Sequence, residues 1–340
     1  MNNIFLEKDL ELLDVKKIYI KKKSKILITG STGFIGSYLS HMLIYISEKK
    51  KLNLEILLTY RNKNKVLKKF SQYKKNKNVK FINLNLNNRQ LFQKKINIIF
   101  HCASYANPSV YKNKFLDVYD ANIKLTIHLC ELLKRNKNAK LIYMSSSEVY
   151  GNIKKNKINE NEYGYIDPMK SNSCYSLSKK VAENIVMNYY KKYRLKIRII
   201  RLFHVIGYNS DKSDNRLFSD LMNNFLNSKR IIKIYSSAKI KRSYCYILDV
   251  LIAILAVLKK GSNGEAYNVG NPKNRVTTKE LISLISKNTN YKKKIKFVNF
   301  VKKNFYLKKN YYPNLNKIKK LGWKPKVNLS ESIRRISQYY

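Results

Sequence analysis

The stretch KILITGSTGFIG, residues 25–36, decides the fold of this chain of 340 residues. Residues 25–29 form an apolar run that ends in a glycine turn, which is typical of a buried parallel strand. Residues 34–47 follow with the spacing of a helix. The regular part of the sequence is therefore expected to begin with a strand, a glycine turn and a helix.

Outward from this unit, apolar runs alternate with helical segments. We expect further strands at residues 54–60, 79–83, 96–101, 140–144 and 195–202, and long helices at about 117–133 and 173–192. Strands that alternate with helices predict a parallel sheet with right-handed crossovers. After about residue 203 the pattern changes to short strands and helices. The predicted fold class is α/β, a Rossmann-type doubly wound parallel sheet with a smaller C-terminal α/β lobe.

Gly30, Gly33 and Gly36 are spaced as GxxGxxG between the first expected strand and helix. Glycines let the backbone turn tightly and approach a pyrophosphate, whose charge then faces the helix N-terminus. In this context the pattern predicts a dinucleotide site. An acidic residue after the second strand would favour NAD, and none is present there. Arg61 at this position suits either a 2′-phosphate or exposure to solvent. NAD is the expected cofactor, and NADP stays open. We expect the cofactor to contact Gly30, Thr32, Gly33, Phe34, Ile35, Gly36, Arg61, Asn85, Leu86, His101, Ala103, Tyr175 and Lys179.

A second constellation follows the fifth expected strand. The segment SSSEVYG, residues 145–151, comes where the carboxyl end of a parallel strand places functional residues. Tyr175 and Lys179 are four residues apart in the next helix and so share one face. A nearby ammonium stabilises phenolate and lowers the pKa of tyrosine from about 10. Tyr175 is therefore a candidate general base, beside which a serine hydroxyl would hold the substrate oxygen.

The charge of the chain needs a separate explanation. The formal net charge is +49, yet only 12 of the 70 basic residues are arginine, and the lysines are scattered. Phosphate and base contacts favour arginine, so we expect solvated surface and no specific nucleic-acid partner. The four cysteines and four histidines have no metal-ligand spacing. No signal peptide is evident and the longest apolar run, Val250–Leu258, is too short to cross a bilayer, so a cytoplasmic location without a membrane span is expected.

Taken in order, the motifs resemble the extended short-chain dehydrogenases/reductases, specifically the nucleotide-sugar epimerase/dehydratase group. The resemblance covers about residues 25–338. It is carried by TGSTGFIGSYL (29–39), HCAS (101–104), SSSEVYG (145–151), CYSLSKKVAEN (174–184), RLFHVIGY (201–208), RSYCYILDV (242–250), GEAYNVGN (264–271) and LGWKP (321–325).

Apolar and charged residues alternate at near-helical spacing over 4–20, which predicts a helical extension (1–24). The resemblance implies an NAD(P)-binding Rossmann domain (25–202) and a nucleotide-sugar-binding lobe (203–340), with some interleaving. It also implies a nicotinamide cofactor that stays bound through the cycle, and a homodimer formed through the helices at 117–133 and 173–192. The implied catalytic residues are Ser146, Glu148, Tyr175 and Lys179, and the implied substrate contacts are Ser147, His204, Arg216 and Arg242.

Within the group, the stretch ENEYGYIDPMKSNSCYSLSKK resembles UDP-glucuronate decarboxylases, although those usually have CYDEGKR where this chain has CYSLSKK. Glu148 suits a decarboxylase or a dehydratase, and Ser147 stands where dTDP-glucose dehydratases carry an aspartate. A transient C4 oxidation is common to all of these enzymes. The prediction is thus a decarboxylase-like enzyme that supplies a surface polysaccharide. A nucleotide-sugar 4,6-dehydratase, a 4-epimerase and a non-catalytic Rossmann-fold sensor are the alternatives.

Overall fold

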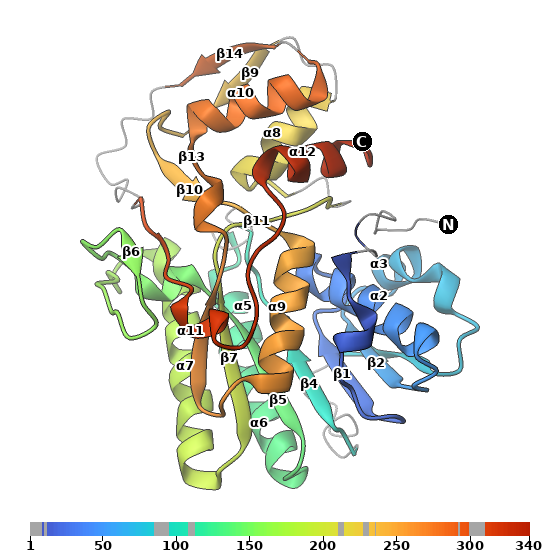
Figure 1. The fold of residues 1–340 in the computed structure, drawn as a ribbon. Coiled ribbons are helices and arrows are strands. Elements are labelled where there is room, and N and C mark those ends of the chain that lie inside the picture. The colour runs from blue at the N-terminus through green and yellow to red at the C-terminus, as the bar shows by residue number, and fades with distance from the viewer. Residues whose placement is uncertain are drawn as a thin grey trace.

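The computed structural model describes residue 9 and residues 12–84, 95–107, 113–209, 214–226, 231–234, 236–291, 293–298 and 310–340. Its main feature is a parallel sheet of seven strands in the order β12-β7-β5-β4-β1-β2-β3 (Figure 1). The strands are β1 (Lys25–Thr29), β2 (Glu55–Tyr60), β3 (Val79–Asn83), β4 (Ile98–His101), β5 (Lys140–Ser146), β7 (Lys196–Leu202) and β12 (Glu265–Val269).

The strand order reverses between β1 and β4. These two strands pair directly, Ile26–Thr29 with Ile98–His101. In open α/β sheets, ligands bind at the carboxyl ends of the strands at such a switch point. The glycine turn follows β1 and the HCAS segment follows β4, so both border this point.

Helices cover both faces of the sheet because successive side chains of a strand point to opposite faces. Ile26 and Ile28 of β1 belong to the larger hydrophobic core, whereas Leu27 belongs to the second. The larger core packs against α2 (Phe34–Lys49), α3 (Lys63–Lys69) and α9 (Ile247–Lys260), and the second against α6 (Leu125–Arg135) and α7 (Cys174–Tyr193). Burial on both faces explains the nearly continuous apolar runs of these strands.

A smaller lobe lies at one end of the sheet (Figure 1). Two-stranded sheets there pair β10 with β13 and β14 with β9, beside three helices. The lobe consists of α8 (Leu217–Leu226), β9 (Ile231–Ile234), β10 (Lys241–Ser243), β13 (Arg275–Thr277), α10 (Thr278–Thr289), β14 (Lys294–Phe297) and α12 (Leu329–Ser337). Short connecting elements are α5 (Phe115–Tyr119), β6 (Lys157–Ile158), β8 (Val205–Ile206), β11 (Cys245–Tyr246), β15 (Tyr312–Pro313) and α11 (Asn316–Lys319).

The predicted α/β fold with its doubly wound parallel sheet is confirmed, and the six expected strands all form. Two features differ from the expected element pattern. β12 returns from beyond residue 203 to the edge of the large sheet, beside β7. The single helix expected at 117–133 is instead α5, a π-helical turn at Asp120–Lys124 and α6. The expected N-terminal helix falls mainly outside the described residues.

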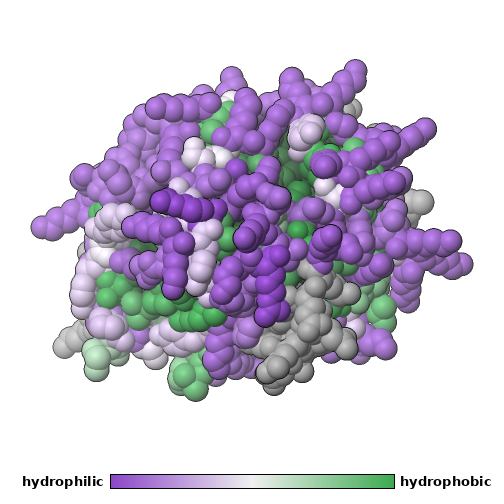
Figure 2. Space-filling model, turned by 90° about the horizontal axis from the view of Figure 1, so that it is seen from below, coloured by the Kyte–Doolittle hydropathy of each residue, from purple (hydrophilic) through white to green (hydrophobic). Residues whose placement is uncertain are grey.

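The large positive charge is distributed over the surface. Figure 2 shows one face of the molecule as largely hydrophilic. Among the described lysines, Lys179 alone is buried. Within the described part of the chain, no helix combines the length and the apolar character needed to span a bilayer.

Candidate active site

The glycine turn lies directly against the chain that leaves β4. Gly30 has a φ of +67°, and a Cβ there would come within 2.6 Å of the Ala103 Cα. A Cβ on Gly36 would come within 2.2 Å of the Gly30 carbonyl oxygen. Gly33 is the N-cap of α2 and, with Thr32, remains accessible. The turn is therefore a backbone-lined approach to a helix N-terminus, which fits the pyrophosphate of a dinucleotide.

The accessible side of this turn continues into Phe34 and Ile35, which are half-buried in the first turn of α2. Beyond β2, the Arg61 guanidinium lies 4.4 Å from the centre of the Tyr105 ring and donates a hydrogen bond to its hydroxyl. Arg61 is thus directed across the switch point toward the chain after β4. The expected contacts Asn85 and Leu86 lie outside the described residues.

His101 occupies the buried end of β4. Its Nδ1 lies 2.8 Å from the Thr29 hydroxyl and its Nε2 lies 3.0 Å from the Thr126 hydroxyl. Burial, with a smaller contribution from nearby Lys179, lowers the pKa of His101 to about 3. The imidazole is therefore neutral and joins β1 to α6 behind the site.

The SSSEVYG segment turns sharply at the end of β5. Ser146 caps a 3₁₀ turn at Ser147–Tyr150, and its hydroxyl accepts a hydrogen bond from the Glu148 amide at 3.2 Å. Ser147 is buried, whereas Glu148 is half-buried. The turn thus brings one hydroxyl and one carboxylate to the carboxyl end of the sheet.

Helix α7 brings Tyr175 and Lys179 to the same place. The Lys179 ammonium donates a hydrogen bond to the Met144 carbonyl of β5 at 2.7 Å, which fixes the helix on the strand. The expected lowering of the Tyr175 pKa is wrong for this structure. Burial raises that pKa to about 12, opposed by a hydrogen bond with Ser146 and by the charge of Arg216, while Glu148 adds to the rise. Burial lowers the pKa of Lys179 to about 7. The two side chains are both nearly inaccessible to water.

This arrangement can take a proton from a hydroxyl group. The Ser146 hydroxyl and the Tyr175 phenol are hydrogen-bonded neighbours, so a substrate oxygen between them would meet both. A positive charge on Lys179 stabilises the phenolate that such a transfer requires. The structure places Ser146 and Glu148 beside Tyr175 and joins Lys179 to β5 through the Met144 carbonyl. That these four residues are catalytic stays a prediction.

Arg216 reaches this site from the smaller lobe. It forms a two-pronged ion pair with the buried Asp214, at 2.8 and 2.5 Å, and its guanidinium lies 5.1 Å from the centre of the Phe34 ring. Arg216 also lowers the pKa of Tyr175 by its charge. An arginine oriented by a carboxylate between the glycine turn and the tyrosine suits an anionic group bound there.

The other two expected substrate contacts are Arg242 and His204. Arg242, on β10, donates hydrogen bonds to Thr278 at 3.3 Å and Ser236 at 3.4 Å, and it also acts on the Tyr244 hydroxyl through its charge and a side-chain hydrogen bond. His204 has a φ of +33° and packs beside the Tyr244 ring at 5.9 Å.

Comparison with known proteins places the chain in a family. The model of the NAD dependent epimerase/dehydratase family matches residues 26–270. The chain belongs to this family. Membership confirms the predicted enzyme class and NAD as its cofactor.

Relatives of this epimerase/dehydratase carry several activities in their names. A dTDP-D-glucose 4,6-dehydratase from Dictyostelium discoideum is 29% identical, covering 93% of this chain and 81% of its own. UDP-glucuronic acid decarboxylase 3 from Arabidopsis thaliana is 28% identical, covering 93% and 88%. The crystal structure of a dTDP-glucose 4,6-dehydratase from Bacillus anthracis in complex with NAD is 26% identical, with a TM-score of 0.76 and coverage of 93% and 96%.

The structure adds site residues of this family member that sequence reasoning missed. Tyr311, from the C-terminal part of the chain, donates a hydrogen bond to the Ser147 carbonyl at 3.1 Å. Tyr143 lies beneath Lys179, 4.8 Å from ring centre to ammonium. Glu183, one turn after Lys179, forms a buried ion pair with Arg201 at 2.7 Å. Only the last pair had a sequence signal, since Glu183 continues the Tyr175–Lys179 face at the same spacing of four.

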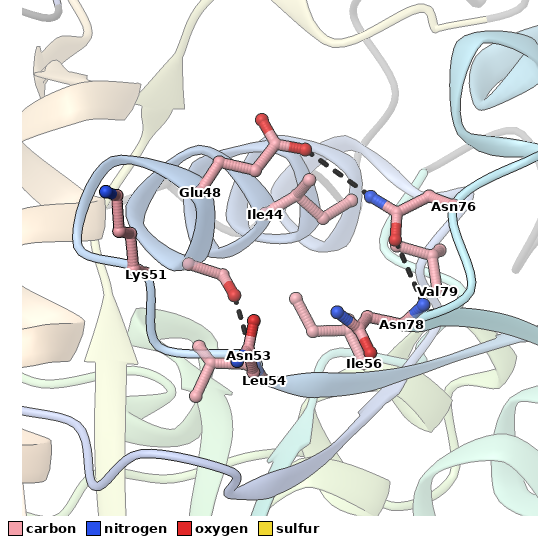
Figure 3. A pocket seen from close by; sticks show the side chains of 10 residues that line it. Ile44, Glu48, Lys51, Asn53, Leu54, Ile56, Asn76, Asn78 and Val79 are labelled. Carbon is pink, nitrogen blue, oxygen red and sulfur yellow. Dashed lines mark hydrogen bonds between the residues drawn. The ribbon is translucent and has the colours of Figure 1, made fainter.

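A separate pocket of about 330 Å³ lies at the amino ends of the strands, opposite the carboxyl ends that carry the candidate site (Figure 3). It is formed by the end of α2 and the amino ends of β2 and β3, with Glu48, Asn76 and Ile56 among its walls. The catalytic groups come from the carboxyl ends of the strands, so this pocket is not part of the candidate active site.

Proposed function

We propose that this chain converts a UDP-linked uronic acid by transient oxidation at C4, followed by decarboxylation. The observation that carries the proposal is Glu148, a carboxylate that raises the pKa of Tyr175, next to Ser147 rather than a second acid. Removal of water from C5 and C6 needs a base and an acid. A carboxylate β to a ketone leaves as carbon dioxide without that pair.

In the proposed reaction, Tyr175 takes the proton from the C4 hydroxyl while Ser146 holds that oxygen. Lys179, when charged, stabilises the phenolate form of Tyr175. The glycine turn of Gly30, Gly33 and Gly36 would hold NAD, which when bound would supply the acceptor and later the donor of the C4 hydride. Loss of carbon dioxide leaves an enolate, and Glu148, protonated from solvent, would give its proton to C5. Tyr175 would then return its proton to the oxygen at C4 as the hydride returns to C4.

The remaining proposed contacts hold the nucleotide sugar. Arg216 and Arg242 would bind its diphosphate, because a guanidinium offers paired donors to phosphate oxygens. Ser147 and His204 would border the sugar. Dehydration and 4-epimerisation remain the alternatives, and relatives with dehydratase names support the former.

The test is incubation of purified protein with UDP-glucuronate, UDP-glucose and dTDP-glucose, followed by mass spectrometry of the products. We expect loss of carbon dioxide from UDP-glucuronate, and no such product with Tyr175→Phe. Water loss from dTDP-glucose with unchanged UDP-glucuronate would replace decarboxylase by dehydratase. Bound NAD without turnover of any sugar would favour a sensor protein.

We also propose a homodimer in the cytoplasm, formed through α5, α6 and α7. These helices expose apolar side chains to solvent. The exposed fractions are 68% for Leu116, 38% for Ile127 and 43% for Val181. Light scattering of the native protein and of Leu116→Glu tests the assembly. The native protein is expected to have twice the monomer mass, and the variant a lower mass.

A further inference from the structure

The buried ammonium of Lys179 rests on the face of an aromatic ring. Its Nζ lies 4.8 Å from the centre of the Tyr143 ring and donates its hydrogen bond to the Met144 carbonyl, the next residue of β5. Tyr143 is fully buried and Lys179 is 2% exposed. A cation within about 6 Å of an aromatic face is attracted by the ring, and the attraction is strongest where water is excluded.

The other charged and titratable groups around Lys179 do not pair with it. On α7, the Glu183 carboxylate is bound by Arg201 through three hydrogen bonds. From β4 and the segment after it, burial lowers the pKa of His101 to about 3 and raises the pKa of Cys102 to about 12, so both are neutral at pH 7. Among the described residues, no carboxylate forms an ion pair with Lys179.

The hydroxyl of Tyr143 contributes little to this contact. It is buried and has no hydrogen-bond partner within the described part of the chain. Burial also raises the pKa of Tyr143 well above its ordinary value, so the ring stays neutral at every working pH. The part of Tyr143 that meets Lys179 is therefore the ring face, which phenylalanine would keep.

We propose that Tyr143 is a positioning residue for the proposed reaction, and that its ring face holds the Lys179 ammonium one helical turn from Tyr175 on α7. This proposal rests on the proposed function only where it is tested by the pH profile of kcat. Without the ring, the ammonium would keep one backbone hydrogen bond and no electron-rich partner. It would then lose its proton at a lower pH, and Tyr175 would lose the charge that stabilises its phenolate.

The test compares Tyr143→Phe, which keeps the ring face, with Tyr143→Leu, which removes it. In the pH profile of kcat, we expect the alkaline limb of Tyr143→Leu to move down by about one pH unit, the amount that a desolvated cation–π contact represents. Tyr143→Phe should keep the limb of the native enzyme. Equal limbs in all three proteins, or equal shifts in both variants, would overturn the proposal.

A second measurement does not depend on turnover. The contribution of Lys179 to the pH dependence of unfolding is obtained by comparing each protein with its Lys179→Met counterpart. We expect this contribution to move down by about one pH unit in Tyr143→Leu and to stay unchanged in Tyr143→Phe. If Tyr143→Leu does not fold, Tyr143→Met serves in both arms. If this contribution shifts in Tyr143→Leu but the protein turns over no sugar, the result supports the role of Tyr143 and counts only against the proposed function.

Discussion

Replacement of Lys179 by methionine should stabilise the fold most strongly at low pH. Burial lowers the pKa of Lys179 from 10.5 to about 7, so below pH 7 the folded protein holds a desolvated charge. That difference in pKa corresponds to about 5 kcal/mol. Because the unfolded chain binds the extra proton between about pH 7 and 10.5, native stability rises with pH across this window.

Lys179→Met removes this cost together with the hydrogen bond to Met144, which is worth about 1 kcal/mol. The variant should therefore exceed the native protein by about 4 kcal/mol at pH 6 and by about 1 kcal/mol at pH 9. Urea unfolding at the two pH values measures both differences. Lys191→Met, at an exposed position of the same helix, is the control and should change stability by less than about 0.5 kcal/mol. Equal differences at the two pH values, or destabilisation at pH 6, would refute the reasoning.

Three further predictions follow from other parts of the site. Gly36→Ala should weaken NAD binding at least tenfold in a titration calorimeter, because its Cβ would lie 2.2 Å from the Gly30 carbonyl oxygen; unchanged affinity would mean that the turn does not hold the cofactor. Glu183→Gln should cost about 3–5 kcal/mol in urea unfolding, because it leaves the buried Arg201 charge without a carboxylate; a loss below 1 kcal/mol would contradict that account. His101 should remain neutral in ¹⁵N NMR spectra from pH 8 down to pH 5, since burial lowers its pKa to about 3; a transition near pH 6.5 would contradict the buried placement.

Local sequence patterns predicted the elements that carry the chemistry. β3 and α7 form within one residue of the expected bounds, because an apolar run or a periodic face identifies a strand or helix without knowledge of its neighbours. The glycine turn and the shared helix face of Tyr175 and Lys179 could be predicted for the same reason, because each depends only on local spacing. The π-helical turn at Asp120–Lys124 was not readable, since one extra residue in a helical turn leaves the apolar pattern almost unchanged.

The supports of the site depend on contacts between distant parts of the chain. Tyr311 meets Ser147 across a separation of 164 residues. Tyr143 looks like any core residue of a buried strand, and only the packing of α7 on β5 places Lys179 over its ring. Periodicity and spacing contain no information on which helix covers which strand position. Residues of this kind therefore required the three-dimensional structure.

The return of β12 to the edge of the large sheet limits how this chain can be divided. A fragment ending at residue 202 would contain six of the seven strands and would expose the β7 edge that β12 normally pairs with. An unpaired edge of this length invites association with other chains. Exchange of the smaller lobe between relatives to alter substrate choice should therefore keep β12 and α9 with the recipient sheet. The practical unit for such grafts is the segment between β7 and α9 together with the segment after β12, rather than everything after residue 202.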